Sequence, residues 1–150
     1  MALSAIARAL SLNASCAIAL YLGALANAFA DRPSVATSLA SRALRLSPFD
    51  TSAFEAHLAL GVVAVREANY DEAILCFARL SQINPRFSTS YFLHAIALAL
   101  AGRREESNQW LQRGLDLEPG FRSRLFAELG MAQIIAEKFV LGARLLGLPE

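Results

Sequence analysis

Charged residues are scarce in this chain, and the residue types that most often carry chemistry are scarcer still. Only 18% of the 150 residues are charged, and the sequence has two histidines and two cysteines. The net charge of +1 does not favour binding to nucleic acid or to an acidic membrane. Cys16 and Cys76 lack the spacing of a zinc site, so we expect them to be reduced and to pack as small apolar residues.

Motifs for nucleophilic or phosphate chemistry are also missing, because the sequence contains neither Gly-x-Ser-x-Gly nor a phosphate-binding loop. His57 and His94 have no carboxylate or cysteine at ligand spacing, so we interpret both as core histidines with satisfied hydrogen bonds. Asp71 and Glu72 fall in the first turn of a predicted helix, where the helix dipole accounts for them. We therefore predict that the protein is not an enzyme and has no catalytic residue, metal or cofactor.

Residues 14–30 form an uncharged stretch that could be read as a signal peptide or a short membrane span. Only Arg8 supplies positive charge before it, and Asn13 and Asn27 interrupt its apolar character. The stretch also coincides with the first helix of a predicted repeat. We therefore expect a helix of a cytoplasmic protein rather than a targeting or membrane segment.

Alanine and leucine dominate the composition, with 54 of the 150 residues, and both favour close-packed helices. Four positions recur at intervals of 34, 37 and 34 residues, each two places after a Leu or Ile that ends an apolar stretch: Ala14, Pro48, Pro85 and Pro119. A period of 34 residues with two helices in each unit is typical of a tetratricopeptide repeat (TPR) solenoid.

The second unit carries the repeat pattern most completely. Gly61 and Ala73 are the small residues where the two helices should cross, Phe77 fills the space between them, and Pro85 ends the second helix. Over residues 2–121 the chain thus resembles TPR proteins. The resemblance implies an all-α fold, a right-handed superhelix of helical hairpins with a C-terminal cap.

Placing each proline at position 32 of its unit divides the chain into one domain with several parts. A half repeat (2–16) precedes three units (17–50, 54–87 and 88–121), and capping helices follow over 122–148. Within that last part, apolar spacing predicts one long helix over residues 122–139.

The half repeat begins in the middle of a unit, and we expect its apolar residues, such as Leu3, Ile6 and Leu10, to lack a neighbour on the outer side. We therefore interpret the chain as the tail of a longer polypeptide.

Arginines recur at position 26 of every unit, on what should be the outer face of the second helices. A nucleic-acid-binding stripe is one interpretation of such a ladder. We favour a solvent-exposed face, because a basic residue near a helix C-terminus complements the dipole. The arginines are Arg8, Arg42, Arg79 and Arg113.

In TPR proteins, positions 2, 5, 9 and 12 of each first helix line the concave face, and ten of these twelve residues are apolar here. An apolar trough of that size is unusual on a monomer, so a partner helix, a second copy or the chain's own terminal helix should fill it. The basic and asparagine residues of the family's carboxylate clamp are missing. We predict the following partner-binding residues: Tyr21, Leu25, Leu58, Val62, Val65, Phe92 and Ile96.

The function predicted from these features is a protein–protein interaction scaffold that binds a partner helix or peptide through the apolar concave groove, without nucleic acid, membrane or small-molecule substrate. The repeat ends, Ser47 to Asp50 and Leu117 to Phe121, also resemble the C-terminal TPR region of bacterial class III adenylate cyclase-like proteins. That second resemblance implies an alternative, a regulatory or dimerisation region of such a bacterial signalling protein, which would form a homodimer.

Overall fold

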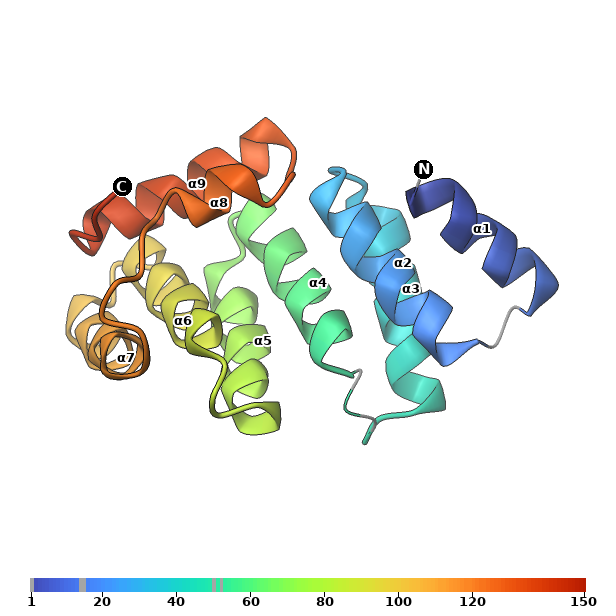
Figure 1. The fold of residues 1–150 in the computed structure, drawn as a ribbon, viewed down its shortest axis with the longest axis horizontal. Helices are drawn as coiled ribbons and strands as arrows, with labels where there is room; N and C mark the ends of the chain where they lie inside the picture. Colours follow the sequence, from blue (N-terminus) through green and yellow to red (C-terminus); the bar gives the residue numbers. More distant parts are fainter. Residues whose placement is uncertain (1, 14–15, 50, 52) are drawn as a thin grey trace.

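The computed structural model describes residues 2–13, 16–49, 51 and 53–150. Ala14, the first of the four periodic positions, and Asp50, the last residue of the first predicted unit, lie outside these ranges. The regular structure of the described residues is helical throughout, as expected, and Figure 1 shows the helices stacked in a curved array. The helices are α1 (Ala2–Leu12), α2 (Ala17–Phe29), α3 (Pro33–Leu46), α4 (Ala53–Arg66), α5 (Tyr70–Ile83), α6 (Ser88–Leu100), α7 (Arg104–Leu117), α8 (Leu125–Glu128) and α9 (Gln133–Leu145).

Three helix pairs form the repeating hairpins, namely α2 with α3, α4 with α5, and α6 with α7. Each pair turns through one residue with left-handed backbone geometry: Asp31 at φ 56°, Ala68 at φ 59° and Gly102 at φ 78°. In every turn the next N–H donates to the carbonyl five residues earlier, at 2.8–2.9 Å. This bond satisfies a carbonyl at the end of the first helix, so the hairpin closes the same way three times.

The second helix of each pair ends two residues before a proline, because the residue before proline avoids the helical conformation. The helix starts also follow local chemistry. Pro33 opens α3, where a missing N–H costs nothing, and the Asn69 side chain accepts a hydrogen bond from the Glu72 N–H at the start of α5. The proline period therefore marks helix ends correctly.

Glycine allows the helices of a hairpin to approach closely. A Cβ atom on Gly61 of α4 would lie 2.3 Å from Cε1 of Phe77 on α5, and one on Gly114 of α7 would lie 2.9 Å from Cε1 of Phe92 on α6. Both distances are too short for a real contact. Each aromatic ring thus fills the space that a side chain at the glycine would need, which is dense interior packing.

The terminal region differs from the single helix predicted over residues 122–139. Helix α8 ends at Glu128, and α9 does not begin until Gln133. Gly130 separates them with φ 71°, a left-handed geometry that ends an α-helix and that glycine adopts at little cost. Helix α9 then runs on to Leu145, beyond the predicted end.

Helix α9 lies across the first helices of the array and packs on α4 and α6 (Figure 1). Helix α4 packs along α2, but it does not pack along α6 in the same way, because α9 enters between them. Phe139 of α9 reaches Phe77 of α5, with ring centroids 6.3 Å apart. At the other end, the Ala132 N–H donates to the Phe29 carbonyl of α2 at 2.7 Å. The terminal helix is therefore part of the core.

Among the described helices, α1 packs chiefly on α2. Ile6 and Leu10 face inward, since a Cβ on Gly23 would lie 3.0 Å from Ile6 Cγ2 and 4.0 Å from Leu10 Cδ1. Exposed residues of α1 include Ser4, Ala7 and Arg8. Ile6 and Leu10 therefore pack on α2 and do not form the apolar outer side that the sequence indicated.

Candidate functional site

The seven predicted partner-binding residues all lie on the first helices α2, α4 and α6, but the structure divides them into two groups. Leu25 and Leu58 are half-buried and border the concave face. The other five have almost no exposed surface, and they are Tyr21, Val62, Val65, Phe92 and Ile96.

The buried group is covered by the protein itself. The Phe92 ring stacks on Phe121 at a centroid distance of 3.8 Å, and a Cβ on Gly142 of α9 would lie 2.5 Å from Cγ2 of Ile96. The hydroxyl of Tyr21 donates to the Ser47 carbonyl at 2.8 Å. The expectation that these side chains are accessible to a partner does not hold in this conformation. Of the three occupants considered for the trough, the chain's own terminal helix covers the part around Ile96.

The remaining concave surface, which we call the open half, lies toward the N-terminal ends of α2, α4 and α6. Ile18 at the start of α2 is 63% exposed, although it is a large apolar side chain. Leu58, Glu55 and Thr89 lie in the N-terminal halves of α4 and α6 and are half-buried. Helix α9 contacts α6 near Ile96 and Leu100, in the other half of that helix, and leaves this surface uncovered.

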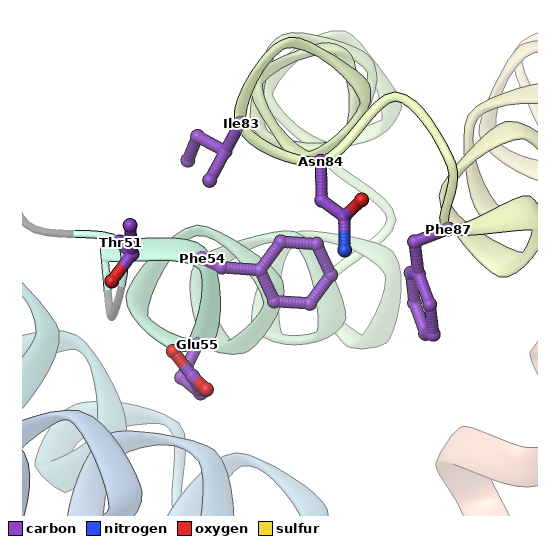
Figure 2. Close-up of a pocket in the computed structure, with 6 residues that line it drawn as sticks. All are labelled: Thr51, Phe54, Glu55, Ile83, Asn84 and Phe87. Carbon is purple, nitrogen blue, oxygen red and sulfur yellow. The ribbon is translucent and has the colours of Figure 1, made fainter.

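A pocket of about 460 Å³ opens between the start of α4 and the turn from α5 into α6. Figure 2 shows the rings of Phe54 and Phe87 on two sides of it, with the amide of Asn84 between them. These rings meet edge to face, with centroids 5.3 Å apart. The residues that line this α4–α6 pocket are Thr51, Phe54, Glu55, Ile83, Asn84 and Phe87.

Glu55 is the charged residue among the described residues that line the pocket. Its Oε2 atom is shielded from solvent and accepts no hydrogen bond within the described structure. Glu55 occupies position 2 of the unit 54–87, one of the twelve positions that the repeat pattern assigns to the concave face, but it was not among the predicted contact residues. The signal was present, because Glu55 and Thr89 are the two polar residues among the twelve concave positions.

His94 differs from the satisfied core histidine that the sequence predicted. Its Nδ1 atom is buried and has no hydrogen-bond partner in the described structure, while its ring stacks on Trp110 at 4.1 Å. Burial is the main cause that lowers the pKa of His94 to about 4, and the positive charge of Arg103 acts in the same direction. Burial also lowers the pKa of His57, with a contribution from Arg79.

Cysteine and acidic residues form no reactive or metal-binding group in the described part of the chain. Cys16 and Cys76 are both free thiols. Burial raises the pKa of Cys76 to about 12, with a further contribution from Glu72, so its reactive thiolate form is disfavoured. The described residues contain no cluster of three His, Cys, Asp or Glu side chains that could hold a metal ion. None of the helices that these residues form combines the length and apolar character needed to cross a membrane.

Several solved structures share this architecture. The match to a crystal structure of MamA covers 97% of this chain and 86% of the MamA chain, with a TM-score of 0.70 and 16% sequence identity. Another crystal structure of MamA protein covers 87% of this chain and 67% of its own, with a TM-score of 0.67 and 23% identity. YrrB is described as a TPR protein with an unusual peptide-binding site. The match covers 97% of this chain and 76% of the YrrB chain, with a TM-score of 0.64 and 20% sequence identity.

No protein-family model and no curated protein matches the sequence. At the sequence identities of the solved structures, the likeness shows the fold alone. The chain is a TPR-type solenoid, a right-handed superhelix of helical hairpins with a C-terminal capping helix.

Proposed function

We propose that this chain is a non-catalytic protein-interaction scaffold that binds a partner peptide or short helix on the open half of its concave face. The observation that carries the proposal is the exposed apolar surface there, because Ile18 is 63% exposed and Leu58, in the N-terminal half of α4, is only half-buried. Apolar surface concentrated on a concave face is a common property of interaction sites. The YrrB structure supports the proposal, because a peptide-binding site is described on a protein of the same fold.

Helix α9 supports the same proposal from within the molecule. It is an amphipathic segment that lies on the first helices, with Ile135 and Phe139 buried and Ile134 and Leu141 exposed. The concave face therefore accommodates one helix already, and only part of that face is used. A partner segment would bury its own apolar stripe on the rest, as in helix-in-groove recognition.

Selection of random peptides displayed on phage against the immobilised chain tests this proposal. We expect enriched peptides to bind the purified chain, and Leu58→Asp to lower their affinity at least about tenfold, because it places a charge in the proposed contact surface. Leu75→Asp is the matched control, since Leu75 is 64% exposed on α5, a second helix. Failure to enrich any peptide, or equal effects of the two substitutions, would contradict the proposal.

The alternative, a dimerisation region of an adenylate cyclase-like signalling protein, is separated by the same variants. Sedimentation of the purified chain reports its oligomeric state directly. A stable dimer that Leu58→Asp dissociates, together with an absence of peptide binding, would favour that alternative over a peptide-binding scaffold.

A further inference from the structure

The α4–α6 pocket lies at the starts of α4 and α6, whereas helix α9 contacts α6 in its other half, near Ile96 and Leu100. Its volume of about 460 Å³ falls within the range of sites that hold small ligands or ligand side chains. The pocket is therefore large enough to receive a side chain of a bound peptide.

Three of the six residues that line this pocket are large apolar side chains, Phe54, Ile83 and Phe87. Ile83 and Phe87 are 37% and 38% exposed, so both can still bury surface against a ligand. The edge-to-face contact with Phe54 holds the Phe87 ring, which lowers the entropy lost on binding. Such walls favour a large aliphatic or aromatic side chain.

Glu55 sets the charge of the pocket. A shielded carboxylate oxygen without a donor is unfavourable, and buried polar groups in proteins are normally hydrogen-bonded. Glu55 has no ion pair or hydrogen bond to lose within the described structure, so its carboxylate can turn toward a ligand without breaking one. No described lining residue is basic, which favours a cation and disfavours an acidic ligand.

Asn84 adds a hydrogen-bond donor on the other side of Phe54 from Glu55 (Figure 2). Its Oδ1 atom accepts the Arg86 N–H at 3.2 Å, and this bond orients the amide. Figure 2 shows the amide nitrogen directed between Phe54 and Phe87. A backbone carbonyl of a bound peptide is the acceptor that this geometry suits.

We infer that the α4–α6 pocket binds a large apolar side chain of a partner peptide, and that Glu55 pairs with a lysine or arginine next to that side chain. This inference rests on the proposed function, because it assigns the partner of the open half to basic, apolar peptides. It also predicts which sequences the chain selects.

The peptide selection described above, carried out on the full chain and on Glu55→Gln, tests the inference. We expect sequences enriched on the unmodified chain to contain Lys or Arg beside a large apolar residue. Glu55→Gln should lower their affinity about tenfold to a hundredfold, as expected for a lost charge-assisted hydrogen bond. The same peptides with the basic residue replaced by norleucine should bind both proteins equally. Glu105→Gln on α7 is the matched control, because it removes the same charge at an exposed position.

Glu55→Lys provides a second variant with an opposite expectation. Its selected peptides should be acidic rather than basic, while circular dichroism shows the helical content unchanged. Enriched peptides without a basic residue, or equal affinity for the unmodified chain and Glu55→Gln, would overturn the inference and leave the proposed function standing. If no peptide is enriched at all, the proposed function and the inference both fail.

Discussion

Replacing Phe139 by alanine should loosen the terminal helix from the array. Phe139 has 0% exposed surface, and its ring lies 5.5 Å from that of Phe126 and 6.3 Å from that of Phe77. Truncating a buried phenylalanine in such a site costs about 3–5 kcal/mol. For a domain of this size that loss corresponds to a fall in Tm of about 6–20 °C.

Urea denaturation followed by circular dichroism measures this loss, and hydrogen exchange shows where it occurs. Because repeat proteins can unfold unit by unit, we expect the amides of α9 to lose protection first. Leu141→Ala is the matched control, because Leu141 lies on the same helix but is 52% exposed, and it should change stability by less than about 0.5 kcal/mol. Equal, small effects of the two substitutions would show that α9 is not inserted between α4 and α6.

Two further predictions concern the core. Gly61→Ala should lower the free energy of unfolding by about 1–3 kcal/mol, because the new methyl group would lie 2.3 Å from Phe77 Cε1 and overpack the site. An unchanged midpoint of urea denaturation would refute the assigned crossing of α4 and α5. The pKa of His94 is about 4 in the folded chain, against an ordinary value of 6.5. Between these two pH values the unfolded chain binds a proton at His94 and the folded chain does not. The free energy of unfolding should therefore fall as the pH is lowered from about 6.5 to about 4. The loss in the free energy of unfolding should approach about 3 kcal/mol. Urea titrations at a series of pH values should show a smaller loss for His94→Phe. The same pH dependence in the variant and the unmodified chain would show that His94 does not cause it.

The hairpins could be predicted from the sequence because their signals are local. Pro48, Pro85 and Pro119 end helices through the backbone geometry of the proline itself, and Gly102 marks a turn for the same kind of reason. Ala68 carries no such signal, because alanine disfavours the left-handed geometry that it adopts. Its turn is indicated instead by Asn69, which follows it and caps α5.

The terminal region could not be predicted in the same way. The apolar character of Phe121, Phe126 and Phe139 indicates burial, but it does not say against what each ring packs. The insertion of α9 between α4 and α6 depends on contacts between residues more than 40 positions apart, such as Ile96 with Gly142. Ile96 is buried for this reason, whereas the Phe92 ring stacks on Phe121 and the Tyr21 hydroxyl donates to the Ser47 carbonyl at the end of α3.

Mapping a bound peptide onto the chain shows directly whether a partner binds the open half of the concave face. A peptide enriched in the selection is titrated into the isotope-labelled protein, and the amide chemical shifts are followed by NMR. We expect the largest changes around Ile18, Leu58 and Phe87, at the N-terminal ends of the first helices. Changes concentrated on the second helices α3, α5 and α7, or along the outer face of α9, would contradict this expectation.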